Sequence, residues 1–163
     1  MTSVRRILSW PGRRWRSRGF GIHSPFAYSF VTETLAAKGA GECEEAIKAI
    51  AGKDFRRLSL LYRCVRHLRP DSIALYPEDD ATARHVIALA SPERNIKVIS
   101  AADNATETPG LYFIADIDRE PSRSVWDSIT ARHTRGMDFS DMRTGLLCPY
   151  PHLPRQSFRI VFR

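Results

Sequence analysis

The spacing of apolar residues changes part-way along this chain, near Pro70. Before that point they recur every three or four residues, a spacing typical of amphipathic helices. The pattern predicts one helix from Pro25, capped by Ser24, to about Gly39. A second helix is expected at about Glu42–Ala51. A third begins after the capping Asp54 and ends before Pro70.

After Pro70 the apolar residues occur in short runs, which are typical of buried strands. The expected strands are Ile73–Tyr76, Ile96–Ser100, Leu111–Ala115, Met137–Phe139, Gly145–Cys148 and Phe158–Phe162. Helices are expected at Asp80–Ala90 and Ser122–Arg132. The first strand, helix and strand favour a right-handed parallel crossover. The loop PYPHLPRQ is expected to join the last two strands as an antiparallel pair.

These elements predict an α/β fold in a single domain. Its N-terminal helices occupy residues 23–70 and a truncated Rossmann-like mixed sheet occupies 71–163, closing with a C-terminal antiparallel hairpin. Residues 1–22 form a basic N-terminal arm. In this arm Val4, Ile7 and Leu8 predict one amphipathic turn, which Pro11–Gly12 is expected to stop.

Positive charge is concentrated in this arm. The formal net charge is +7, and the first acidic residue is Glu33. Six arginines precede it: Arg5, Arg6, Arg13, Arg14, Arg16 and Arg18. Arg13, Arg14, Arg16, Arg18 and His23 are therefore candidate anion-binding residues, for nucleic acid or an anionic surface. The alternative is a solvated arm that folds back onto acidic surface.

The composition excludes several classes of protein. No apolar run approaches the roughly 20 residues that a membrane span needs. Cys43, Cys64 and Cys148 are odd in number and far apart, which favours reduced thiols in a cytoplasmic protein over a zinc site or disulfides. The sequence also lacks the nucleophile, phosphate-loop and zinc-protease motifs of common enzymes, and we expect no metal.

The stretch SIALYPEDDATARHVIALA, residues 72–90, predicts a strand, a tight turn and a helix. This is the layout of a nucleotide-binding unit, whose turn is normally rich in glycine because backbone N–H groups must approach the ligand closely. Here no glycine occurs between Gly52 and Gly110. The turn carries Glu78, Asp79 and Asp80, which could bind a divalent cation but more often cap the helix.

Three other stretches carry a resemblance to a known family. They are RGFGIHSPFAYSFVTE, YFIADIDREPSRSVW and MDFSDMRTGLLCPYPHLPRQSFRIVFR, which together cover about two fifths of the chain. They resemble a bacterial subfamily of class I S-adenosylmethionine-dependent methyltransferase-like proteins with an N-terminal HSPF segment. The resemblance implies N-terminal helices, a Rossmann-like sheet and a closing antiparallel hairpin.

The family's cofactor motif is an acidic residue with two or three glycines at the end of the first strand, and ALYPEDDATAR stands in its place. If S-adenosylmethionine binds, the resemblance implies contacts from Tyr76, Glu78, Asp79, Asp103 and Asp116. Ser100 stands where an acidic residue usually holds the ribose. The loop SAADNATETPG is too short for the third and fourth strands. A sheet without them has an exposed edge at IKVIS, where a homodimer or protein partner could pair.

Three hypotheses follow from the sequence. The first is a degenerate, non-catalytic methyltransferase-like protein that acts as a regulatory or partner subunit, with no cofactor. The second is an active methyltransferase with an unorthodox cofactor pocket. The third is a basic module that binds nucleic acid or an anionic surface.

Overall fold

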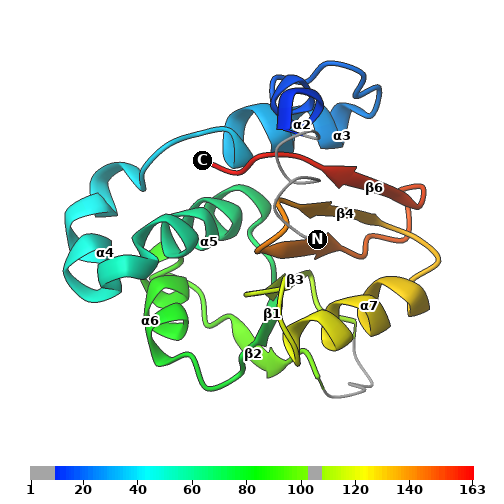
Figure 1. The fold of residues 1–163 in the computed structure, drawn as a ribbon. Coiled ribbons are helices and arrows are strands. Elements are labelled where there is room, and N and C mark those ends of the chain that lie inside the picture. The colour runs from blue at the N-terminus through cyan, green and yellow to red at the C-terminus, as the bar shows by residue number, and fades with distance from the viewer. Residues whose placement is uncertain (1–9, 103–107) are drawn as a thin grey trace.

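A computed structural model describes residues 10–102 and 108–163 (Figure 1). The turn expected at Val4–Leu8 and the candidate Asp103 lie outside the described residues. The helical elements are α2 (Trp10–Arg16), α3 (Pro25–Ser29), the π-helical η1 (Phe30–Leu35), η2 (Gly41–Cys43), α4 (Glu44–Ala51), η3 (Gly52–Asp54), α5 (Phe55–Leu68), α6 (Ala81–Ala90) and α7 (Ser122–Arg132). No described helix is both long and apolar enough to cross a membrane.

Six strands form one mixed sheet, which confirms the expected α/β class. They are β1 (Ser72–Tyr76), β2 (Lys97–Ser100), β3 (Leu111–Ile114), β4 (Met137–Ser140), β5 (Gly145–Cys148) and β6 (Gln156–Arg159), in the order β2-β1-β3-β5-β4-β6. β1 pairs in parallel with β2 and with β3. β5 runs antiparallel to both of its neighbours, β3 and β4.

Alternating residues of the strands pack into two separate cores, one on each face of the sheet. Ile73, Leu75 and Phe113 belong to the larger core, with side chains of η1, α4, α5 and α6. Ala74 and Tyr112 belong to the smaller core, which α7 covers through Ile129. Figure 1 shows the same division, with α4, α5 and α6 together on one side and α7 on the other. This alternation is the expected consequence of the two-residue period of a strand.

The pairing of the last strands differs from the prediction. The antiparallel hairpin joins β4 to β5, and β6 pairs in parallel with β4 instead of with β5. The cause is visible in the packing, because the ring of Phe158 stacks on that of Phe139, with centroids 5.2 Å apart. β6 also ends at Arg159, so Ile160 and Phe162 are buried beyond the strand, in the C-terminal segment.

The first helix also differs from the prediction. Pro11–Gly12 does not stop a helix but lies inside α2, with Pro11 in the first turn. Proline is tolerated there because the first N–H groups of a helix have no intrahelical partner. α2 is held on the domain by Ser17, whose hydroxyl accepts the Val161 N–H at 2.8 Å. The residue that follows α2 is thus hydrogen-bonded to the C-terminal segment.

The connection from β2 to β3 is short. Its described residues, 101–102 and 108–110, contain no helix or strand. β1 leads through α6 to β2 on one side, and the chain then returns to place β3 on the other side of β1. The strand order therefore reverses at β1, and the carboxyl ends of β1 and β3 flank the point where open α/β sheets bind ligands.

Candidate functional site

The corner between β1 and α6 is the site at which a ligand is expected in this topology. Its acidic turn begins after Tyr76 and ends at Asp80, the N-cap of α6. The Asp80 Oδ1 accepts the Ala83 N–H at 2.8 Å, which satisfies one of the unpaired donors of the helix. The sequence allowed either Asp79 or Asp80 as the cap, and the structure selects Asp80.

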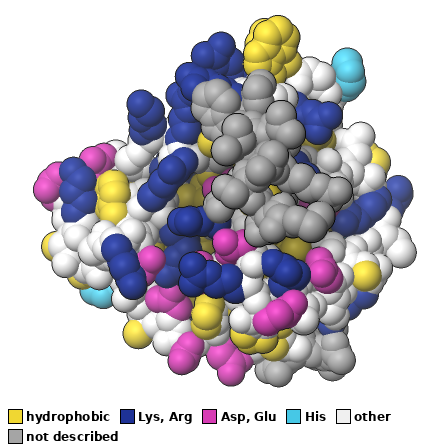
Figure 2. Space-filling model, viewed as in Figure 1, with side chains coloured by type: hydrophobic (Ala, Val, Ile, Leu, Met, Phe, Trp, Pro, Cys, Tyr) yellow, Lys and Arg dark blue, Asp and Glu magenta, His cyan; other side chains and the backbone are white. Residues whose placement is uncertain are grey.

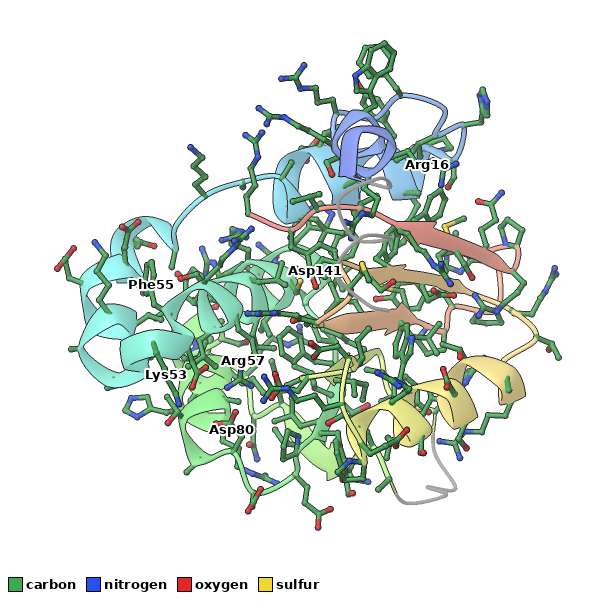
Figure 3. All side chains as sticks on the ribbon, viewed as in Figure 1. Arg16, Lys53, Phe55, Arg57, Asp80 and Asp141 are labelled. Carbon is green, nitrogen blue, oxygen red and sulfur yellow. The ribbon has the colours of Figure 1, made fainter. Side chains whose placement is uncertain are left out.

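The second carboxylate oxygen of Asp80 has a partner on another helix. The Arg57 Nη1 of α5 donates to Asp80 Oδ2 at 2.9 Å, and both side chains are mostly buried. Figure 3 labels the pair between α5 and α6. Arg57 also lies 3.7 Å from Asp54 at the start of α5. Both oxygens of Asp80 are therefore engaged, Oδ1 in capping α6 and Oδ2 in joining α6 to α5.

The rest of the turn offers few groups for a ligand. Pro77 follows the strand directly and has no N–H to donate. The Glu78 carbonyl accepts a hydrogen bond from Arg84 of α6 at 3.0 Å. The side chains of Glu78 and Asp79 are exposed and acidic. Such a turn repels phosphate and presents side chains where a cofactor-binding turn presents bare backbone.

Of the candidate cofactor contacts, the structure brings together Tyr76 and Asp116 at the same edge of the sheet. Tyr76 pairs with Ile114, two residues before Asp116, and the Ala115 N–H donates to the Tyr76 carbonyl at 2.8 Å. Asp116 is exposed and has a positive φ of 54°. Ser100 ends β2, and its hydroxyl accepts the Ala102 N–H at 3.3 Å. These positions follow from the parallel register of β1, β2 and β3.

The exposed acidic groups of the corner are the carboxylates of Glu78, Asp79 and Asp116. Across the described part of the chain, no group of three or more His, Cys, Asp or Glu side chains is placed to hold a metal ion. The Asp80–Arg57 pair joins α5 and α6.

The basic N-terminal segment is divided by the structure into inward and outward residues. Arg13 is only 8% exposed, and its Nη1 lies 3.5 Å from the Asp141 carbonyl oxygen. The other candidates, Arg14, Arg16, Arg18 and His23, are exposed. Figure 3 labels Arg16 on α2 at the top of the molecule. Four of the five candidate anion-binding residues thus face solvent.

An exposed aromatic pair stands among these arginines. Trp15 is 64% exposed and Phe20 is 59% exposed, and their ring centroids lie 5.3 Å apart. Tyr28 of α3 is also half-exposed, and its ring covers Gly19. Figure 2 shows yellow and dark blue side chains side by side at the top of this face. Large exposed aromatic side chains in a basic setting are typical of interaction surfaces.

Two of the three cysteines lie in the core. Cys64 and Cys148 are completely buried, and burial raises the pKa of the Cys64 thiol to about 12 and that of Cys148 well above its usual value. A thiol with so high a pKa is protonated and unreactive at neutral pH. Burial also raises the pKa of Tyr150. These groups are parts of the core.

Comparisons with protein-family models, with curated proteins and with solved structures gave no match. The function is therefore argued from the geometry of the chain itself. Sequence reasoning did not find Arg57, whose pairing with Asp80 decides the character of the corner. No sequence signal could have found it, since the two residues are brought together only by the packing of α5 on α6.

Proposed function

We propose that this chain is a non-catalytic, methyltransferase-like domain that acts as a regulatory or partner subunit. The observation that carries the proposal is the β1–α6 corner, where Asp80 is bound to Arg57 and to the start of α6. Pro77 and the acidic turn take the place of the glycines that the resemblance leads us to expect. The parallel β2-β1-β3 unit supports the methyltransferase-like part of the proposal.

Isothermal titration of the protein with S-adenosylmethionine, and with its demethylated product, tests this proposal. We expect no binding heat and no rise in melting temperature with either compound. Saturable binding that is weakened by Asp116→Ala and by Tyr76→Ala would contradict the absence of a cofactor and favour the alternative, an unorthodox cofactor pocket. Arg135→Gln, a change in an exposed loop far from the corner, is the matched control.

A second function is favoured by the exposed aromatic and basic residues of the N-terminal segment. We propose that Arg16, Arg18 and the Trp15–Phe20 pair contact a polyanion, either nucleic acid or an anionic surface. Arginine supplies attraction to phosphate and an aromatic ring supplies stacking or interfacial insertion. Arg13 is excluded from the proposal because it faces the domain.

Binding of a single-stranded oligonucleotide and of phosphatidylserine-containing vesicles distinguishes the two partners. Binding to either is expected to fall steeply with salt, as phosphate contacts do. Arg16→Gln with Arg18→Gln is expected to weaken it, and Trp15→Ala to weaken it further. Binding that is indifferent to salt and to these changes would remove this second function.

We further propose that a protein partner or second copy pairs at β2. This strand lies at one end of the sheet order, so one row of its backbone groups has no neighbouring strand. A protein that remains a monomer in light scattering at high concentration would exclude self-pairing there. The cytoplasm is our proposed location, since all three cysteines are free.

A further inference from the structure

A basic hollow lies between α2, the loop after η1, α5 and the C-terminal segment. Its volume is about 580 Å³. The described residues that line it are Arg14, Ser17, Lys38, Arg56, Val161 and Arg163. Four of these six side chains carry a positive charge, and no described lining side chain is acidic. Figure 2 shows dark blue side chains gathered at the top and upper left of the molecule, where these elements meet.

Hydrogen bonds to the backbone fix the segments that carry these cations. Arg56 of α5 donates through Nη2 to the Phe162 carbonyl, next to Arg163. Ser17 follows α2, and its hydroxyl contacts the backbone of Val161 twice. It accepts from the Val161 N–H at 2.8 Å and donates to the Val161 carbonyl at 3.1 Å. The C-terminal segment is therefore attached to both α2 and α5, which keeps the backbone positions of Arg14, Arg56 and Arg163 close together.

Arg63 of α5 supplies the remaining attachment. It donates from Nε to the Thr34 carbonyl at 2.9 Å and from Nη1 to the Gly39 carbonyl at 2.5 Å, and these acceptors precede and follow Lys38. Its Nη2 donates to the Arg163 backbone oxygen. One guanidinium thus holds the loop of Lys38 and the segment of Arg163 on the same helix. Because the backbone is already held in place, a ligand does not have to order these segments when it binds.

The charge and size of the hollow define its ligand. Four positive side chains around one space attract an anion, and the attraction is stronger in a recess than on a flat surface. The volume lies within the usual range for small-molecule sites, roughly 300 to 1,000 Å³, and is far larger than one phosphate ion needs. Arginine and lysine are the side chains that proteins use for phosphate.

We propose that this hollow binds a compact ligand that carries two or more phosphate groups, contacted by Arg14, Lys38, Arg56 and Arg163. The ligand is either a free polyphosphate compound or the phosphorylated headgroup of a lipid. This site goes beyond the basic surface proposed above, because Lys38, Arg56 and Arg163 lie outside residues 1–22. It depends neither on the methyltransferase-like assignment nor on Arg16 and Arg18.

The test is calorimetric titration of the full chain with inorganic tripolyphosphate, beside flotation with two kinds of vesicle. One vesicle is phosphatidylcholine alone and the other contains a phosphorylated inositol lipid as well. We expect saturable binding of tripolyphosphate, or of the phosphoinositide vesicles alone if the ligand is a headgroup. Lys38→Gln and Arg163→Gln are each expected to weaken the affinity about tenfold.

Two controls make the outcome decisive. Arg135→Gln removes one exposed charge just before β4, at a residue that does not line the hollow. It is expected to leave the affinity within about twofold. Arg16→Gln with Arg18→Gln is expected to leave tripolyphosphate binding nearly unchanged while it weakens the proposed polyanion surface. The proposal is overturned if neither probe binds. It is also overturned if binding is unaffected by Lys38→Gln and Arg163→Gln in proteins whose melting temperatures match the parent.

Discussion

Asp80 joins two helices through its two carboxylate oxygens. One oxygen caps α6 and the other accepts from Arg57 of α5. Because the side chain is mostly buried, water replaces these bonds poorly when the carboxylate is removed. This single residue therefore contributes to the stability of the corner that a ligand would have to enter.

Asp80→Ala is expected to lower the free energy of unfolding by about 1 to 2 kcal/mol, because it removes both the helix cap and the Arg57 partner. Asp80→Asn keeps a good capping side chain and is expected to cost less. Urea denaturation followed by circular dichroism measures both changes. Asp79→Ala, at the exposed neighbour, is the control and should change stability by less than about 0.5 kcal/mol. Equal losses for Asp80→Ala and Asp79→Ala would contradict the assignment.

Ser59 differs from Asp80 because its buried polar group has no described hydrogen-bond partner. Its hydroxyl is buried in α5 and is the one buried side-chain oxygen or nitrogen without a hydrogen-bond partner in the described part of the chain. Ser59→Ala removes this unpaired group and adds a better helix former. We expect it to raise the free energy of unfolding by about 0.5 to 1 kcal/mol in the same urea experiment. A loss of stability would mean that the hydroxyl has a partner.

At the scale of the elements, local patterns predicted where helices and strands lie. α7 and β5 have the expected bounds, Ser122–Arg132 and Gly145–Cys148. Apolar spacing, caps and proline determine these bounds within a few residues of sequence. Pairing between strands is not local, and the predicted β5–β6 pair was wrong because β6 packs on β4 through Phe158 and Phe139.

The candidate sites likewise depend on contacts between segments that are distant in the sequence. The parallel order of β1 and β3 places Tyr76 and Asp116 at one edge of the sheet, while their contact with a cofactor stays a prediction. The basic hollow could not be predicted, because its cations come from positions 14, 38, 56 and 163. Basic residues that lie so far apart in the sequence form no recognisable motif. Only the attachment of the C-terminal segment to α2 and α5 brings them together.

The contact of α7 with the sheet depends on the absence of a side chain at Gly145. A Cβ atom there would lie 2.6 Å from the Trp126 ring. Gly145→Ala is therefore expected to destabilise the protein by about 1 to 3 kcal/mol through overpacking. In a Trp126→Ala background the same change should cost less than half as much. Denaturation of the two single variants and the double variant measures the coupling, and purely additive losses would contradict it.

At the scale of the whole molecule, two cores share one sheet and the larger contains both buried thiols. Burial raises the pKa of Cys64 from 9.0 to about 12. Above about pH 9 the unfolded chain loses this proton while the folded chain keeps it. The unfolded state then binds fewer protons, so that stability falls as the pH rises.

We therefore expect the free energy of unfolding to decrease between about pH 9 and pH 12, the interval between the unfolded and folded pKa of Cys64. Urea titrations across this interval measure the slope. Cys64→Ala is expected to make the slope shallower, whatever its effect on absolute stability. An unchanged slope would show that Cys64 does not carry the effect.

The tryptophan that lies over Gly145 also gives the molecule an internal optical reporter. Trp126 is partly buried against the sheet, whereas Trp15 is 64% exposed to solvent. Their fluorescence emission should therefore differ in wavelength, bluer for Trp126 and redder for Trp15. Replacement of both Trp10 and Trp15 by phenylalanine would leave Trp126 as the one tryptophan, and its signal would follow the departure of α7 from its face of the sheet.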